Sequence, residues 1–174
     1  GAKSAQEIRS IDGEVTTWTI ARCDVGQPSD VQRLLAAQPL RALGCVWHSA
    51  GVLADGLVAS QGAASLRRVY APKAGAARLM HRATAAVPLD ALVLYSSVAA
   101  LFGGVGQSNY AAANSALDAL ATLRCARGSP GSSIQWGPWA EVGMAAGHAV
   151  NARLKASGMG LITAAEAASA WRAA

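Results

Sequence analysis

Cysteine is scarce in this chain of 174 residues: there are three, at positions 23, 45 and 125, and no two of them form a CxxC motif. An odd and widely spaced set neither builds a disulfide framework nor holds zinc, and reduced cysteines are typical of cytoplasmic proteins. The three histidines have no second histidine or carboxylate at the spacing that metal ligands need. We therefore expect a cytoplasmic protein without a metal site.

Long hydrophobic runs and dense clusters of charge are also absent. Apolar residues make up 52% of the chain, but no uninterrupted run approaches the roughly 20 residues of a membrane-spanning helix. No signal peptide is visible at the N-terminus. The net charge of +5 comes from scattered basic residues, of which only Arg67 and Arg68 are adjacent, and no aromatic residues interleave with them. The composition predicts a folded, soluble domain that binds neither a membrane nor nucleic acid.

Short apolar stretches alternate with longer segments of helical spacing. The expected strands are residues 14–22, 44–48, 91–96 and 132–136, and the expected helices are residues 29–37, 61–86 with an interruption at Pro72, and 107–127. Two of these strands are almost wholly apolar before a polar end, which is typical of parallel strands buried on both faces. The alternating order predicts an α/β fold with a doubly wound parallel sheet, whose ligands bind beyond the carboxyl ends of the strands.

The two ends of the sequence differ from a complete dinucleotide-binding sheet. Residues 4–10 resemble the end of a helix rather than a first strand, and no GxGxxG turn occurs. Near the other end, Thr163 and Glu166 form a capping box that opens a last helix. We expect an N-terminally truncated Rossmann-like core at 1–140 that lacks its first β-α-β unit. An Ala- and Gly-rich segment at 141–162 and the start of a final helix at 163–174 follow it.

Residues 95–117 hold the side chains best suited to chemistry. Ser97 follows a predicted strand, Tyr110 comes thirteen residues later, and Asn114 lies four positions further on the same helix face. A serine hydroxyl can bind a ketone oxygen, and a tyrosine can protonate that oxygen as hydride arrives. A phenol has a reference pKa of about 10, so this chemistry at neutral pH calls for a nearby lysine that favours the phenolate. The set is suited to reducing a carbonyl.

Each of these residues also has a plainer explanation. Ser97 could cap a helix, and Tyr110 could be a packing residue with a wet hydroxyl. Lys73 could be a solvated charge, Asn114 a helix-surface amide, and Asp24 a turn cap. Their joint occurrence in one order favours the catalytic interpretation.

Four segments in a fixed order carry a resemblance: HSAGVLADG, APKAGAARL, LYSSVAALFGGVGQSNYAAANSALDAL and IQWGPWAEVGMA. They resemble the ketoreductase domain of type I polyketide synthases and animal-type fatty acid synthases, a branch of the short-chain dehydrogenase/reductase superfamily. The similarity runs from about residue 5 to residue 174. It implies NADPH-dependent reduction of a β-ketoacyl thioester on an acyl carrier protein to a β-hydroxyacyl thioester. The implied partners are that carrier, other synthase domains or a complementary N-terminal segment.

The resemblance implies a role for each catalytic residue. Tyr110 would donate the proton, and Ser97 would bind the substrate carbonyl. Lys73 would favour the tyrosine's phenolate and bind the nicotinamide ribose, while Asn114 would support a water-linked proton relay. Most short-chain dehydrogenases have lysine four residues after the tyrosine, where this sequence has Asn114. The exchanged lysine and asparagine are typical of synthase ketoreductases.

The resemblance also implies cofactor and substrate contacts. The implied cofactor-binding residues are those that would contact the adenine, the ribose or the nicotinamide: Asp24, Val25, Ser49, Ala50, Gly51, Lys73, Tyr110, Gly137 and Pro138. Residues 141–160 would form a lid over the substrate. The residues that would contact the substrate or control its stereochemistry are Asp55, Phe102, Asn109, Trp139 and Met144. The tripeptide at 53–55, with Phe102 and Asn109, favours the D-hydroxyl (B-type) product.

Two other functions are compatible with the sequence. A chain without the glycine-rich unit can be a catalytically silent piece that holds a larger synthase together or pairs with a complementary segment through an open sheet edge. A reductase of a free small ketone would have the same fold, but the exchange of Lys73 and Asn114 weighs against it.

Overall fold

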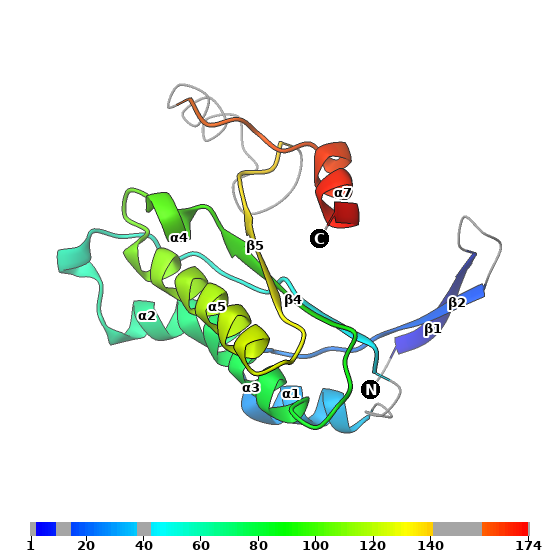
Figure 1. Cartoon of the computed structure of the whole chain (residues 1–174). Coiled ribbons are helices and arrows are strands. Elements are labelled where there is room, and N and C mark those ends of the chain that lie inside the picture. Colours follow the sequence, from blue (N-terminus) through cyan, green and yellow to red (C-terminus); the bar gives the residue numbers. More distant parts are fainter. Residues whose placement is uncertain (1–2, 10–14, 38–42, 141–157, 174) are drawn as a thin grey trace.

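The computed structural model describes residues 3–9, 15–37, 43–140 and 158–173 (Figure 1). Its strands are β1 (Lys3–Arg9), β2 (Val15–Ile20), β3 (Cys45–His48), β4 (Ala91–Ser97) and β5 (Ser132–Trp136). Its α-helices are α1 (Pro28–Ala36), α2 (Ala63–Tyr70), α3 (Ala76–Ala83), α4 (Ala99–Phe102), α5 (Ser108–Ala126) and α7 (Ala164–Ala173). A 3-10 turn, η2 (Val58–Ser60), and a π-helical turn, η3 (Ala71–Gly75), complete the set.

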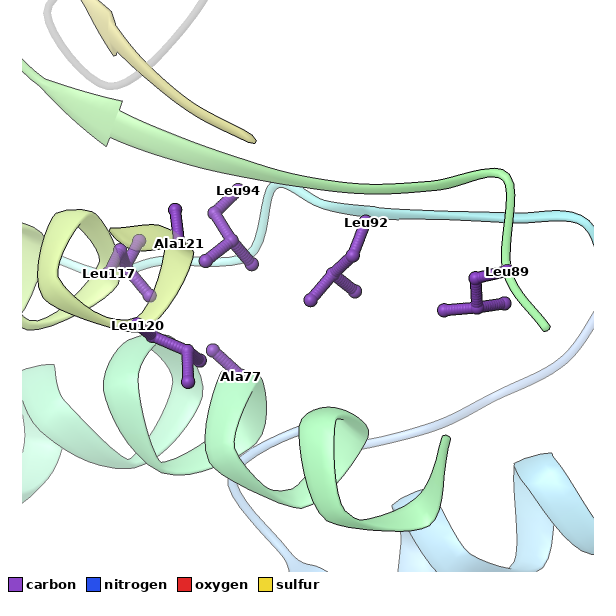
Figure 2. Packing of buried hydrophobic residues seen from close by; sticks show 7 residues of the cluster. All are labelled: Ala77, Leu89, Leu92, Leu94, Leu117, Leu120 and Ala121. Carbon is purple, nitrogen blue, oxygen red and sulfur yellow. The ribbon is translucent and has the colours of Figure 1, made fainter. Parts of the chain in front are cut away.

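The centre of the fold is a parallel sheet in the order β3-β4-β5. Every second residue of β4 is buried, beginning with Leu92 and Leu94. These side chains point toward α3 and α5, where they join a core cluster made of Ala77, Leu89, Leu92, Leu94, Leu117, Leu120 and Ala121 (Figure 2). The period-2 alternation of a strand therefore decides which side chains reach the helices.

The other face of the same sheet is aromatic. Trp47 of β3 stacks on Trp171 of α7 with ring centroids 5.8 Å apart, and Tyr95 of β4 meets the same ring edge-on at 6.0 Å. α7 therefore lies across the strands from α3 and α5, which places helices on both faces and confirms the predicted α/β class (Figure 1). Trp47 is still 50% exposed, so the expectation of β3 being buried on both faces is wrong.

The N-terminal region differs from the prediction. Residues 4–10 were expected to end a helix, but β1 runs antiparallel to β2, with Gln6 opposite Trp18 and Arg9 opposite Val15. The strand expected at 14–22 does form as β2, but in this separate two-stranded ribbon rather than in the parallel sheet. The two segments are close in sequence, so antiparallel pairing satisfies their backbone groups at once.

The long helical segment predicted around Pro72 is divided as expected. α2 ends at Tyr70, the π-helical turn η3 follows, and α3 starts at Ala76. Proline lacks the N–H that an α-helix needs, so the ladder rearranges at this point. π-turns often mark functional positions, and this one holds Lys73.

The other predicted helices also form. α1 and α5 match the segments expected at 29–37 and 107–127. The capping box is confirmed: the Thr163 N–H donates to Glu166 Oε2 at 2.8 Å, and the Glu166 N–H donates to Thr163 Oγ1 at 3.2 Å. Most of the loose segment expected at 141–162 lies outside the described residues. Within the described part of the chain, no helix has the length and apolar character needed to cross a membrane.

Candidate active site

Tyr110 lies in the first turn of α5, directly after the buried side chain of Asn109. The Asn109 Oδ1 accepts the backbone N–H of Tyr110 at 2.7 Å, and its Nδ2 donates to the Ala54 carbonyl at 2.8 Å. The first N–H groups of a helix have no partner within the helix, so this side chain satisfies one of them. Asn109 thus connects the start of α5 to residues 53–55.

Lys73 is buried, and its ammonium group faces the ring of Tyr110. Its side chain is 3% exposed, and its Nζ donates to the Tyr95 carbonyl at 2.9 Å and lies 5.4 Å from the centre of the Tyr110 ring. That placement contradicts the alternative of a solvated surface charge. Burial, opposed only in part by the Asp118 carboxylate, lowers the pKa of Lys73 to about 8. An ammonium within about 6 Å of an aromatic face is also attracted to the ring.

Asn114 lies one helical turn after Tyr110 and is fully buried, so it is not a helix-surface amide. Its Nδ2 donates to the Tyr110 carbonyl at 2.8 Å, which ties the two predicted residues together. Its Oδ1 is buried and has no hydrogen-bond partner among the described residues. An unpartnered buried acceptor is costly, and in native structures it often indicates a bound water or ligand.

Ser97 is the last residue of β4, at the carboxyl edge of the sheet where ligands of such folds bind. Its Oγ accepts the N–H of Ala99 at 3.2 Å, so part of its role is to begin α4. The preceding residue, Ser96, donates its hydroxyl to the Asn114 carbonyl at 3.3 Å. The end of β4 therefore packs directly on the half of α5 that holds Tyr110 and Asn114.

Gly51 follows β3 and leaves room for the lysine. A Cβ added at this position would lie 2.8 Å from Cε of Lys73 and 3.6 Å from its Nζ, so any side chain here would displace the buried lysine. Ser49 and Ala50 precede it at the end of the strand. Behind it, Nε2 of the buried His48 makes a 3.0 Å hydrogen bond with the Lys73 carbonyl, and burial lowers the pKa of this histidine. Gly51 of the predicted turn and the adjacent His48 therefore both lie against Lys73.

Asp24 and Val25 belong to a turn on the other side of the π-helical segment. The Asp24 Oδ1 accepts the N–H of Gly26 at 2.9 Å, and a Cβ on Gly26 would lie 3.5 Å from the Ala71 methyl group. Here Asp24 does form the plain turn that the alternative explanation describes, and this turn packs against η3, two residues before Lys73.

Gly137 and Pro138 follow β5 and lie beside the segment that leads into α7. A Cβ on Gly137 would come within 3.2 Å of Ile162 Cδ1, and the Pro138 carbonyl accepts the N–H of Ile162 at 2.8 Å. Trp139 packs on the buried Trp136 with centroids 5.1 Å apart. The loop expected beside the nicotinamide is therefore held from both sides.

The residues expected to control stereochemistry differ in their exposure and in their contacts. Asp55 accepts a hydrogen bond from Gln107 Nε2 at 3.1 Å, next to the contact between Asn109 and Ala54. Phe102, by contrast, is 77% exposed at the end of α4. Met144 lies outside the described residues.

Two polar residues near Tyr110 could not be identified as part of the site from the sequence. Gln61 and Gln107 both reach across between loops, and nothing in their local patterns separates them from surface glutamines. Only the fold brings their partners within reach.

Together these side chains offer a phenol, a buried cation that faces the phenol ring, and an unpartnered buried oxygen one helical turn away. Such a set can bind the hydroxyl groups of a sugar and protonate an oxygen that is being reduced. A buried ammonium and an unpartnered buried oxygen are a donor and an acceptor that suit a group rich in hydroxyls, such as the ribose of a nicotinamide cofactor.

Known proteins with similar sequences are parts of large synthases. A family model described as the KR domain matches residues 1–141. The chain is 47% identical over 137 residues to polyketide synthase GfsB of Streptomyces halstedii, covering 78% of this chain and 2% of that protein. It is 41% identical over 143 residues to the spectinabilin polyketide synthase system protein NorB of Streptomyces orinoci, covering 82% and 6% respectively. The chain thus spans a small fraction of these curated relatives.

Solved structures give the same picture. One described as A-type ketoreductases from a modular polyketide synthase superposes with a TM-score of 0.82 at 44% identity. A second, described as an A1-type ketoreductase, has a TM-score of 0.81 at 42% identity. Each alignment covers 87% of this chain and 32% of the other.

Proposed function

The chain belongs to the KR domain family, whose relatives here are polyketide synthases, and from this premise we propose that it reduces a β-ketoacyl thioester to a β-hydroxyacyl thioester. The proposed substrate is held on the phosphopantetheine of an acyl carrier protein, the proposed reductant is NADPH, and the other synthase domains are the proposed partners. One observation carries the proposal: the buried Lys73 ammonium faces the Tyr110 ring, with Asn114 one turn behind it.

In the proposed mechanism, each residue acts on the substrate carbonyl or on its neighbours. Ser97 donates its hydroxyl hydrogen to the carbonyl oxygen and holds it in place. Tyr110 transfers its phenolic proton to that oxygen as the C–O bond gains charge. Lys73 stabilises the phenolate that remains, because an adjacent cation favours the charged form. Asn114 supports the return of a proton to the tyrosine.

NADPH, when bound, supplies the hydride that the β-carbon accepts. The residues that would hold it are those that surround the lysine or follow the strands: Asp24, Val25, Ser49, Ala50, Gly51, Lys73, Tyr110, Gly137 and Pro138. The absence of a side chain at Gly51 supports this assignment, since a Cβ there would lie 2.8 Å from Cε of Lys73 and would displace the lysine that is proposed to bind the ribose. The choice of NADPH over NADH rests on the family resemblance.

We also propose the D-hydroxyl (B-type) configuration for the product and a substrate lid at residues 141–160. The stereochemical proposal rests on Asp55, Phe102 and Asn109, with Trp139 and Met144 as further substrate contacts. The two similar structures described above are A-type enzymes, so product configuration is a necessary measurement.

The test is NADPH consumption with a β-ketoacyl thioester surrogate, monitored together with the configuration of the hydroxyl product. We expect Tyr110→Phe to reduce turnover by about 10²- to 10⁴-fold, the usual contribution of a positioned general acid. Tyr70→Phe, which removes the same hydroxyl from the end of α2, is the matched control and should react like the wild type. A folded wild-type protein without turnover would favour the alternative of a silent structural or complementing piece of a synthase.

A further inference from the structure

One amide side chain joins two loops that flank the proposed proton donor. Gln61 Nε2 donates to the Gly56 carbonyl at 2.8 Å and to the Gly106 carbonyl at 3.1 Å. Its Oε1 accepts the hydroxyl of Ser108 at 3.2 Å. A glutamine amide has two N–H donors and one carbonyl oxygen, and here all three groups are used. Gln61 is therefore bound to both loops in one defined orientation.

The two backbones also touch each other directly at this point. The Gly56 N–H donates to the Gly106 carbonyl at 2.9 Å. Gly106 has a φ of +73°, and a Cβ there would lie 3.3 Å from the Gly56 nitrogen. Position 106 thus needs glycine both for its left-handed conformation and for the close approach of residue 56.

Further contacts on either side make this a clamp, which we define as Gly56, Gln61, Gly106, Gln107 and Ser108. Gln107 holds Asp55 at 3.1 Å, and Asn109, 1% exposed, holds the Ala54 carbonyl at 2.8 Å. Residues 54–61 are consequently tied to residues 106–109 through several independent hydrogen bonds.

The clamp acts on the helix turn that presents Tyr110. The residue before α5, Gln107, makes no side-chain capping bond to the helix, and Asn109 accepts the Tyr110 N–H from within the first turn. The contacts with Gln61 and Ala54 hold that turn against residues 54–61. Ser108 and Asn109, which begin α5, are the residues that the clamp and the Ala54 contact hold. A shift of this turn would move the tyrosine hydroxyl relative to any substrate that lies over residues 54–61.

We propose that Gln61 is a positioning residue: it fixes the turn that holds Tyr110 against residues 54–61 and so determines which face of the substrate carbonyl receives hydride. This inference rests on the proposed reductase function and extends it. Gln61 touches neither Tyr110 nor Lys73 through any hydrogen bond in the described part of the chain; it acts through the two loops.

The test variant is Gln61→Glu in the full-length protein. The substitution keeps the shape of the side chain but replaces both N–H donors with an oxygen that faces two carbonyls. We expect kcat to fall by about 10- to 100-fold, as misplacement of a catalytic group by about 1 Å does. We also expect the minor hydroxyl configuration to become a measurable fraction of product. Gln32→Glu on the exposed side of α1 adds the same charge and should change neither quantity.

A second variant approaches the same contact from the opposite loop. Gly106→Ala should cause the same loss of stereochemical purity, because its methyl group pushes against residue 56. Gln61→Glu with wild-type kcat and a wild-type product ratio would overturn the inference, as would a lowered melting temperature without any change in product ratio. If the wild type shows no Tyr110-dependent turnover, the proposed function fails first and the positioning role with it.

Discussion

The two halves of α5 differ in whether their buried polar side chains have hydrogen-bond partners. The first half buries Asn109 and Asn114, and Asn114 Oδ1 has no partner among the residues that the structure describes. The second half buries Leu117 and Leu120 in the core and satisfies its one buried charge, Arg124. The Arg124 guanidinium donates to the Pro130 carbonyl at 2.7 Å and contacts a histidine ring nitrogen at 2.9 Å.

This difference is the one that the proposed function predicts, with the first half of α5 facing a ligand and the second half packing the core. Leaving a buried acceptor unpaired costs about 1–3 kcal/mol, and a helix that only had to pack would avoid that cost. The lysine opposite the first half adds to it, since burial disfavours the charged form of Lys73. Unfavourable burial of this kind is found at functional sites, and the packing of a core such as the one around Leu117 offsets it.

The largest effect should come from the first half. We expect Tyr110→Phe to reduce turnover by about 10²- to 10⁴-fold, because the proton donor is lost, while the melting temperature stays within the range of the Tyr70→Phe control. Paired assays of NADPH consumption and thermal unfolding measure both quantities. Loss of folding in Tyr110→Phe would contradict the division between the two halves.

A change in the second half should act on stability instead. Leu117 is fully buried in the core cluster, and truncation of such leucines costs about 2–5 kcal/mol. We therefore expect Leu117→Ala to lower the free energy of unfolding by that amount, as measured by urea denaturation. A matched control is Leu123→Ala, which truncates a partly exposed leucine of the same helix and should cost much less. Equal losses of unfolding free energy in the two variants would contradict the placement of the core at Leu117.

The buried lysine makes stability depend on pH in a definite direction. With a pKa of about 8 in the folded chain and 10.5 as its ordinary value, Lys73 binds fewer protons when folded than when unfolded between these pH values. Stability therefore rises with pH across that window, by at most about 1.4 kcal/mol per pH unit. Unfolding of wild type and Lys73→Met from pH 7 to 10 isolates this contribution. A wild-type advantage that shrinks as pH rises would mean that folding raises the pKa of Lys73, so that burial does not dominate its titration.

The smallest expected change in stability concerns Asn114. Replacing it with leucine removes a buried oxygen that has no partner among the described residues, and the Tyr110 carbonyl that loses the side-chain donor keeps its place in the backbone ladder of α5. We expect Asn114→Leu to unfold at nearly the wild-type urea concentration and to lose most of its turnover. A destabilisation as large as that of Leu117→Ala would show that Asn114 is mainly a structural residue.

The local signals in the sequence predicted a large part of this structure. The apolar run before Ser96 predicted β4, Pro72 predicted the break between α2 and α3, and the Thr163 and Glu166 pair predicted the start of α7. These succeed because strand alternation, a missing N–H and a capping box depend on a few neighbouring residues. The pairing of β1 with β2 was not predicted, because a strand is defined by its partner.

For the candidate site, too, some features could be predicted from the sequence and others could not. The sequence by itself determined which chemistry the chain can offer, since Ser97, Tyr110, Lys73 and Asn114 are reactive or polar wherever they lie. Only the tertiary structure decided that Lys73 is buried against the Tyr110 ring, and that Gln61 spans the carbonyls of residues 56 and 106. Burial, a shifted pKa and a hydrogen bond across 45 positions all depend on distances in space, and those distances exist only after the sheet and its helices have packed.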